Sequence, residues 1–333
     1  MENLMIDSCV FFKMIGYNNF VQKYGKEHFD MLLQMQFQSI KNIENQIKST
    51  LNSEFFEKYS NLPFEDQIDK YKLWSSNAVN GALKQIKSID NKLEYYGKYI
   101  SEYNKKVLVE RRELLNEQVC NIVKFSDVEQ LINSYKLKKD SIGSGLIYKG
   151  YIDGKYKLFT NAFCYDEILN HTKPVEDKRF LQVSRQEVDD LFKHFTLIFT
   201  KSDEVLRQIN DMSKDYRTET NNKNEKAMSE DINSVNDFGD SKIAAFSNLS
   251  GMVLVTHNAK DFIFDKGIGK HNTNKLNHLM SVNKNYFGTT DAKIYTTFDI
   301  LNGDYEKPKI MPGYKLESIK KAGIEFSEEF EMC

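Results

Sequence analysis

The chain has 333 residues, of which 40% are hydrophobic and 13% aromatic, and its formal net charge is −2. This length allows one large domain or two ordinary ones, and the composition excludes wholesale disorder. The near-neutral charge excludes a basic surface over the whole chain, so any contact with nucleic acid requires a local patch. The four cysteines lie far apart without a CxxC spacing, which argues against a zinc site or a disulfide framework.

The N-terminus does not have the pattern of a signal peptide. Glu2 and Asp7 stand where positive charge would be expected, and the apolar run is short. No stretch approaches the ~20 consecutive apolar residues of a membrane helix. We therefore expect a cytoplasmic protein with no membrane partner.

A short strand followed by a long helical block is predicted for the first 140 residues. Residues 4–12, LMIDSCVFF, predict a buried strand that ends near Asp7. Residues 17–140 carry apolar side chains at helical spacing, interrupted at Pro63, and predict an all-helical block. The pattern SDVE at 126–129 is a capping box, which opens one more helix.

Within this block, residues 86–107 have a coiled-coil-like apolar pattern. The steps between apolar residues alternate three and four from Ile86 to Val107. Such a seam fits a helical hairpin within one chain, and it also fits a zipper between two copies in a homodimer. We expect Tyr96 and Tyr103 of the seam, and Trp74 before it, to be core residues.

After residue 140 the pattern changes to alternating strands and helices. Gly143 and Gly145 mark the change, and residues 146–159 predict a β-hairpin around a type I′ turn at Asp153-Gly154. Helices are then expected at 164–171, at 183–195 with Ser184 and Glu187 as a capping box, at 202–212 and at 240–251. Strands are expected at 196–200, 252–256 and 293–301, and a polar loop at 213–235. This alternation predicts an α/β fold with a parallel sheet.

Four carboxylates fall at or near the ends of these elements. Asp7 closes the first strand, Glu167 lies in a short helix, Asp240 starts a helix and Asp261 follows the strand 252–256. Because the carboxyl ends of parallel strands meet at one edge of a sheet, these residues can converge there. Oxygen ligands without His or Cys are those that Mg²⁺ or Mn²⁺ prefers. The sequence therefore allows a divalent metal site at this edge.

Each carboxylate also has an ordinary interpretation. Asp240 can be a helix cap, Asp261 a solvated loop residue and Glu167 an exposed helix charge. Asp7 fits such an interpretation least well, because a carboxylate that closes an apolar strand is costly to bury without a partner.

Several stretches resemble, in chain order, the motifs of the PIN-domain nucleases. MIDSCVFF has Asp7-Ser8 after an apolar strand, and FCYDEILNH has Glu167 before Ile-Leu. The most specific stretch is DSKIAAFSNLSGMVLVTHNAKDF, in which Asp240 precedes Ile-Ala-Ala, Thr256 and Asn258 form T-x-N, and Asp261 precedes Phe. KIYTTFDIL follows later. The resemblance covers residues 1–12 and about 143–301, and it leaves out the helical block.

The resemblance implies a PIN-like parallel sheet flanked by helices, with an all-α, coiled-coil-like hairpin inserted after the first strand. The nuclease domain would comprise residues 1–16 and 141–305, the insertion residues 17–140, and the C-terminal tail residues 306–333. The insertion and the long segment after Phe262 are departures from compact members of the family, and both bear on substrate choice.

The resemblance also implies a catalytic role for the four carboxylates. Asp7, Glu167, Asp240 and Asp261 would bind one or two Mg²⁺ or Mn²⁺ ions, supported by hydrogen bonds from Ser8, Thr256 and Asn258. Asp237 is either an additional ligand or a loop residue. The implied activity is that of an endoribonuclease, as in the toxin ribonucleases of toxin–antitoxin pairs and in RNA-processing enzymes. The expected partners are an RNA substrate and a protein antitoxin or defence-system partner.

Two other functions stay open at this point. One is a PIN-like scaffold that binds RNA or protein without cleavage, against which the presence of all four acidic positions argues. The other is a nuclease for structured DNA, against which the near-neutral charge and the lack of a DNA-binding motif argue.

Basic residues near the motifs are candidates for contacts with substrate phosphate. Lys13, Lys242 and Lys260 flank the expected ligands. The segment 266–275, KGIGKHNTNK, predicts a flexible basic loop and lacks the spacing of a phosphate-cradling loop. The histidines of this region, His257, His271 and His278, lack zinc-ligand spacing, and we expect them at the surface or in a groove.

Overall fold

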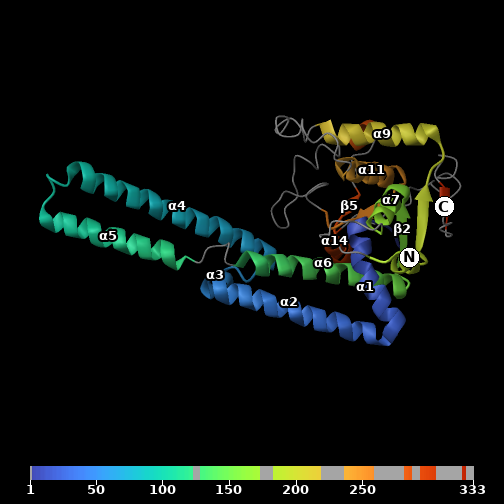
Figure 1. Ribbon diagram of the computed structural model, residues 1–333, viewed down its shortest axis with the longest axis horizontal. Coiled ribbons are helices and arrows are strands. Elements are labelled where there is room, and N and C mark those ends of the chain that lie inside the picture. Colours follow the sequence, from blue (N-terminus) through green and yellow to red (C-terminus); the bar gives the residue numbers. More distant parts are fainter. Residues whose placement is uncertain are drawn as a thin grey trace. The chain divides into compact units, whose positions relative to one another are not determined.

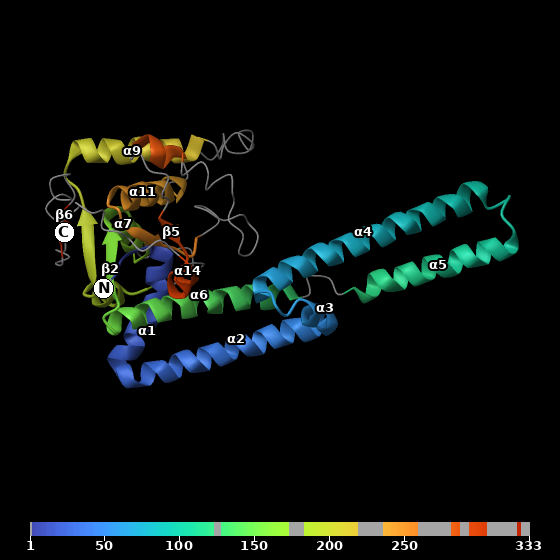
Figure 2. The same cartoon turned by 180° about the vertical axis from the view of Figure 1, so that it is seen from behind.

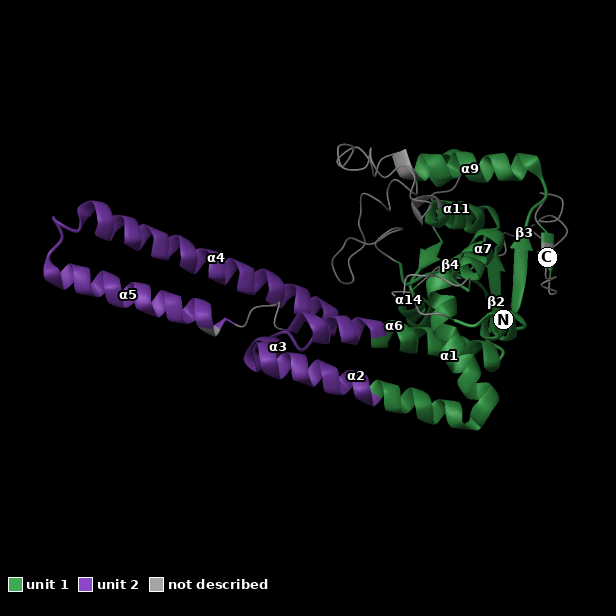
Figure 3. Ribbon diagram, viewed as in Figure 1, with its two compact units in different colours: residues 1–37, 138–266, 270–333 green, residues 38–137, 267–269 purple. Residues whose placement is uncertain are grey.

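The computed structural model describes residues 2–122, 128–172, 183–218, 236–258, 281–286, 293–304 and 325–327. The chain divides into two units (Figure 3), and each is described by itself. Unit 1 comprises residues 1–37, 138–266 and 270–333, and unit 2 comprises residues 38–137 and 267–269. The division falls inside two helices, α2 (Phe29–Leu51) and α6 (Glu129–Ile152).

Unit 1 alternates strands with helices. In chain order its elements are β1 (Glu2–Ile6), α1 (Ser8–Tyr24), a 3₁₀ turn η1 (Lys26–His28), β2 (Tyr156–Asn161), α7 (Ala162–His171), α8 (Arg185–Phe192), β3 (Phe195–Phe199), α9 (Asp203–Thr218), α11 (Asn236–Leu249), β4 (Val253–Val255), β5 (Ile294–Tyr295), α14 (Thr297–Asn302) and β6 (Glu325–Ser327). The expected capping box between Ser184 and Glu187 is present at the start of α8.

The strands form one sheet in the order β5-β4-β1-β2-β3-β6. The first five run parallel, and β6 pairs antiparallel with β3. The central strand β1 pairs on one side with β2 and on the other with β4, in a register that places Ile6 opposite Val255. The predicted α/β class with a parallel sheet flanked by helices is confirmed.

Both faces of this sheet are covered by helices (Figures 1 and 2). The side chains of β1 alternate between the faces, so that Met5 joins a cluster with α9 and α11, while Leu4 and Ile6 join a cluster with α1, α6 and α8. β4 alternates in the same way, with Leu254 on the first side and its two valines on the second. This three-layer arrangement buries the centre of the sheet and brings the carboxyl ends of the parallel strands to one edge.

Unit 2 consists of helices joined by short turns, with no strand among its described residues. It contains α3 (Ser53–Lys58), α4 (Phe64–Tyr96) and α5 (Glu102–Asn121), together with parts of α2 and α6. α4 and α5 form an antiparallel hairpin (Figure 1) whose contact is made by Ala82, Ile86, Ile89 and Leu115. The coiled-coil-like seam is therefore a hairpin within one chain. None of the described helices in either unit is long and apolar enough to cross a membrane.

The predicted β-hairpin at 146–159 is wrong. Residues 129–152 are one helix, and only residues 156–161 form a strand, which is parallel to β1. Gly143 and Gly145 lie inside this helix, at positions where neighbours leave no room for a side chain. An added Cβ would meet Thr297 at 2.2 Å from position 143 and Tyr17 at 2.7 Å from position 145. The glycines that suggested a change of structure are thus sites of close packing.

The predicted last strand at 293–301 is also mostly wrong. Only Ile294 and Tyr295 are in a strand, and Thr296 with Asp299 forms a capping box that starts α14. The expected polar loop at 213–235 is helical up to residue 218, and its remainder lies outside the described residues. β6 belongs to the C-terminal tail, where no strand was predicted.

The expected core positions of three aromatic residues in unit 2 are wrong as well. Tyr96 and Tyr103 are 62% and 75% exposed, because α4 ends at Tyr96 and the apolar seam does not continue through the turn. Trp74 is 41% exposed, with its ring against Phe55 and Tyr71. Ser126 of the predicted capping box lies outside the described residues.

Candidate functional site

Asp7 lies at the junction between the central strand and the first helix. β1 ends at Ile6, and Asp7 is the N-cap of α1, where its Oδ1 accepts a hydrogen bond from the Ser8 backbone N–H at 2.8 Å. An aspartate is among the residues that cap helices best. The side chain is nevertheless only 2% exposed, which is unusual for a cap.

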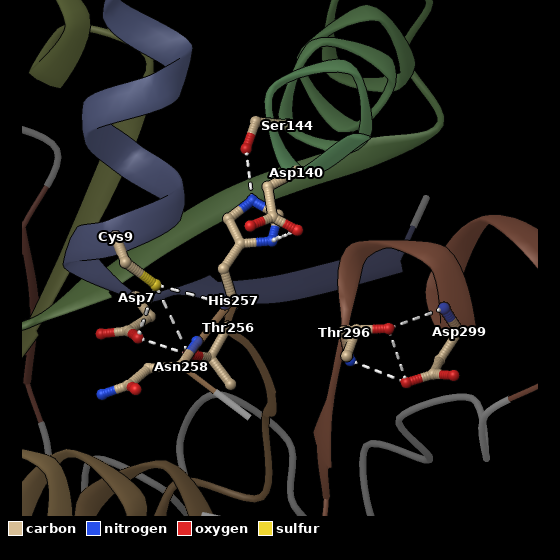
Figure 4. Close-up of polar contacts among 9 residues, drawn as sticks. All are labelled: Asp7, Cys9, Asp140, Ser144, Thr256, His257, Asn258, Thr296 and Asp299. Atoms are coloured by element: carbon tan, nitrogen blue, oxygen red, sulfur yellow. Dashed lines mark hydrogen bonds and ion pairs between the residues drawn. The ribbon is translucent and has the colours of Figure 1, made fainter. Parts of the chain in front are cut away.

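The second oxygen of Asp7 is held by residues from two elements (Figure 4). Its Oδ2 accepts hydrogen bonds from Thr256 Oγ1 at 2.6 Å and from the Cys9 thiol at 3.1 Å. Thr256 directly follows β4, and the register of β1 with β4 brings the two strand ends together. The Asp7 N–H donates to Val255 O at 3.1 Å, which fixes the backbone of the junction.

No cation in the described part of the chain balances the charge of Asp7. Burial raises the pKa of Asp7, and the hydrogen bonds from Thr256, Cys9 and Ser8 offset only part of that effect. Among the described residues, no Lys, Arg or His forms an ion pair with it. An ionised carboxylate in such a place gains strongly from an added positive charge.

Glu167 approaches Asp7 from a neighbouring helix. α7 follows β2 directly, and Asn161 caps it. Burial raises the pKa of Glu167, the charge of Asp7 raises it further, and a hydrogen bond from the Ser8 side chain lowers it. Its Oε2 is enclosed and accepts no hydrogen bond within the part of the chain that the structure describes. The interpretation of Glu167 as an exposed helix charge is therefore wrong.

Asp240 is connected to Asp7 through a short chain of hydrogen bonds. Asn258 Nδ2 donates to Asp240 Oδ2 at 3.1 Å, and the Asn258 N–H donates to Thr256 Oγ1 at 2.9 Å. Thr256 in turn donates to Asp7. α11 begins at Asn236, four residues earlier than expected, so Asp240 is not at the helix start and does not cap it. Its half-buried carboxylate faces the loop after β4.

The structure thus brings together six of the residues predicted from the sequence, namely Asp7, Ser8, Glu167, Asp240, Thr256 and Asn258. Asp261, Lys260, His271, His278 and the segment 266–275 lie outside the described residues, as does the side chain of Asp237. In the described ranges, no group of three or more His, Cys, Asp or Glu side chains is arranged to hold a metal ion. A complete ligand set at this place requires a further residue.

Two of the three candidate lysines, Lys13 and Lys242, lie among the described residues. Lys13 is half-buried on α1, and its charge contributes to lowering the pKa of His257. Lys242 Nζ lies 5.6 Å from the centre of the Phe163 ring, which connects α11 with α7.

Two cysteines close to Asp7 were not recognised as site residues from the sequence. Cys9 Sγ lies 3.1 Å from Asp7 Oδ2, and Cys164 Sγ lies 3.9 Å from Asp7 Oδ1. Burial, and then the charge of Asp7, raise the pKa of both thiols well above the ordinary value, so they stay protonated and donate. The only signal in the sequence was the position of Cys9 in the first turn after Asp7.

His257 is buried, so its expected surface or groove position is wrong. Its ring Nε2 is 2.7 Å from Ser144 Oγ, and its Nδ1 is 3.6 Å from Asp140 Oδ1 (Figure 4). Burial lowers its pKa to about 3, so the ring is neutral near pH 7. The three residues have the connectivity of a nucleophile–base–acid triad, but Ser144 is fully buried and cannot reach a substrate. They instead anchor the loop after β4 to α6.

Comparisons of the chain with protein-family models, with curated proteins and with solved structures found no match.

Proposed function

We propose that this protein is a Mg²⁺- or Mn²⁺-dependent endoribonuclease with a PIN-like nuclease domain. The observation that carries the proposal is the buried Asp7 carboxylate, which stands at the carboxyl end of the central parallel strand and has no compensating cation among the described residues. Sites of open α/β sheets gather at this edge. The order of the motifs along the chain, and their resemblance to PIN-domain nucleases, support the choice of reaction.

The residues present fit a divalent cation of the Mg²⁺ type. Glu167 offers an enclosed oxygen without a hydrogen bond in the described part of the chain, and its charge raises the free energy of ionised Asp7 nearby. The donors are carboxylate oxygens, whereas the nearby thiols are protonated and the imidazole of His257 is committed to Ser144. Asp7 and Glu167 would hold the ion, with Asp240 and Asp261 completing the set.

A divalent ion in this place supplies Lewis-acid polarisation of a phosphodiester and a bound water of lowered pKa. The chain's own residues position the ligands. Thr256, Ser8 and Cys9 fix the plane of the Asp7 carboxylate, and Asn258 fixes that of Asp240. Thr256 joins both, because it donates to Asp7 and accepts from the Asn258 backbone. Such orientation of ligands by neighbouring hydrogen bonds is what tunes metal sites in proteins.

The choice of RNA as substrate rests on the resemblance, and so does a protein antitoxin or defence-system partner. Lys13, whose charge acts on His257, and Lys242 of α11 would contact substrate phosphates.

Cleavage of labelled single-stranded RNA tests this proposal. We expect cleavage with Mn²⁺ or Mg²⁺, none with EDTA, and a loss of at least about 100-fold in Asp7→Asn and in Asp240→Asn. Asp211→Asn is the matched control, because Asp211 is an exposed helix carboxylate paired with Lys214. Thermal unfolding of each variant separates a lost site from a lost fold.

Binding of Mn²⁺, measured by calorimetry, gives a second readout that does not depend on activity. Native-like cleavage by Asp7→Asn would contradict the assignment of the site. Mn²⁺ binding that requires Asp7, without cleavage of RNA or DNA, would instead show a non-catalytic scaffold.

A further inference from the structure

The turn between α4 and α5 carries an exposed group of tyrosines. Tyr95, Tyr96, Tyr99 and Tyr103 fall within nine residues and are 69%, 62%, 87% and 75% exposed. No hydroxyl of the four has a hydrogen-bond partner within the described ranges. A group of exposed aromatic rings needs an explanation, because a soluble surface rarely gathers large apolar side chains unless they bind something.

The same part of the hairpin is basic. Residues 84–112 contain eight Lys or Arg and four Asp or Glu, a surplus of four positive charges, whereas the whole chain has 46 basic and 48 acidic residues. Three of the four acids are paired with cations: Asp90 with Arg112 at 2.7 Å, Glu110 with Lys106 at 4.0 Å, and Glu102 with Lys105. The surplus is therefore concentrated on lysines that the hairpin itself does not use.

Those lysines are Lys84, Lys87, Lys92 and Lys98, which form no ion pair with any described residue. On α4 the buried side chains Ile86 and Ile89 face α5. Helical spacing places Lys84, Lys87 and Tyr95 together on the opposite side, and it places Lys92 next to Tyr96. Ammonium groups and aromatic rings thus lie together on the exposed surface of α4 and around the turn.

We infer that residues 84–112, the outer half of the α4–α5 hairpin, bind single-stranded RNA, with tyrosine rings stacking on unpaired bases and lysines contacting phosphates. Stacking on aromatic rings together with contacts from nearby cations is the general mode for unpaired nucleic acid. The charge surplus complements a polyanion, and the exposed rings carry hydroxyl groups that suit a wet surface. The role of this surface in capturing a substrate rests on the proposed ribonuclease function.

Fluorescence anisotropy of the full chain tests this inference. The probe is a labelled RNA of about 20 nucleotides, made of adenine and cytosine only so that it cannot pair. EDTA prevents cleavage, so that binding is measured apart from turnover. We expect the triple variant Tyr95→Ala, Tyr99→Ala, Tyr103→Ala to raise Kd at least about tenfold, and the corresponding Phe variants to restore binding.

Two further variants sharpen the test. Tyr24→Ala, at a 48% exposed tyrosine of unit 1, is the matched control and should leave Kd unchanged. Changing Lys84, Lys87, Lys92 and Lys98 to Gln should weaken binding and reduce the slope of log Kd against log salt by up to about 3.

An unchanged Kd in the triple variant, or equal affinity for duplex RNA, would overturn the inference. Tyrosine-dependent binding to phosphatidylserine vesicles or tyrosine-dependent self-association, with no effect on RNA, would overturn it in favour of a membrane surface or a second copy. Tyrosine-dependent RNA binding without cleavage would contradict the proposed ribonuclease and leave this inference standing. Cleavage of RNA together with an unchanged Kd in the triple variant would support the proposed ribonuclease and contradict this inference.

Discussion

The same types of side chain are buried around the sheet of unit 1 and exposed on the α4–α5 hairpin of unit 2. Tyr148 in unit 1 is 2% exposed and donates to Asn18 at 2.8 Å, whereas Tyr99 in the hairpin is 87% exposed. Asp7 is 2% exposed and has no cationic partner within the ranges that the structure describes, whereas the side chain of Asp90 is 44% exposed and paired with Arg112. Residue type alone therefore does not decide the role of an aspartate or a tyrosine.

The difference follows from the number of layers. A sheet covered on both faces removes water from the ends of its strands, so that polar groups there must find protein partners or pay for their burial. Two helices that touch along one line bury only a narrow stripe, and every other side chain stays in water. Asp7 in unit 1 is therefore desolvated, whereas the side chains on the outside of the hairpin stay hydrated.

The largest expected effect is a loss of folding stability when the pH is lowered, because His257 is buried in unit 1. The unfolded chain binds a proton at His257 near pH 6.5 and the folded chain only near about 3, so stability should fall as the pH decreases from 6.5 toward 3. The loss is at most about 5 kcal/mol from this group. In His257→Gln, urea unfolding should depend less on pH over this range, whereas His28→Gln, at an exposed histidine, should behave like the parent. An equal fall in His257→Gln would show that the burial of His257 does not govern acid sensitivity.

The next largest effect is expected from truncating one core side chain in each region, which should lower the free energy of unfolding by different amounts. Phe246→Ala, at a 1% exposed residue of α11, should cost about 3–5 kcal/mol. Ile89→Ala, at a 5% exposed residue of the hairpin, should cost about 2 kcal/mol, because a two-helix contact collapses more easily around the lost volume. Hydrogen exchange should show weaker protection of β1 and β4 in the first variant, and of α4 and α5 in the second.

Trp74, the single tryptophan, lies in unit 2, and its fluorescence gives an independent report on that unit. If Ile89→Ala weakened protection of β1 and β4 as much as Phe246→Ala does, the two units would unfold as one, and the contrast would not extend to their stability.

The smallest expected effects on stability come from replacing two helical glycines with alanine, and the two effects should have opposite signs. A Cβ at Gly145 of α6 would lie 2.7 Å from Tyr17 and 3.0 Å from Leu33, so Gly145→Ala should destabilise by about 1–3 kcal/mol. A Cβ at Gly81 of α4 meets nothing within 4 Å, so Gly81→Ala should stabilise by about 1 kcal/mol. Thermal unfolding of both variants measures the difference, and effects of the same sign would contradict the packing argument.

Local patterns in the sequence predicted much of the fold. The capping box at Ser184 and the strand β4 were correctly predicted, and the block 17–140 is mainly helical in its described residues, because such features depend on residues a few positions apart. Of the predicted strand at 4–12, only residues 4–6 lie in β1, and residues 8–12 begin α1. The failures came where a local signal had a distant cause. Gly143 and Gly145 suggested a turn, but they are required by Tyr17 and by α14.

The candidate site was predicted in part. The motif order pointed to Asp7, Glu167 and Asp240, which the structure brings near one another through Thr256 and Asn258. The thiols around Asp7 and the burial of His257 could not be predicted, because their neighbours come from α7 and α6, far away in the sequence.

The sequence by itself determined that the chain alternates strands and helices around an apolar sheet, that a helical block follows the first strand, and that Asp7 stands at the end of that strand. Periodicity and capping depend on residues within one or two turns of the chain, so these features can be predicted from the sequence. Only the tertiary structure decided that Asp7 loses its water, because the residue that holds it, Thr256, comes 249 positions later. It also decided that the hairpin tyrosines stay in water, because α5 turns back before the apolar seam can cover them.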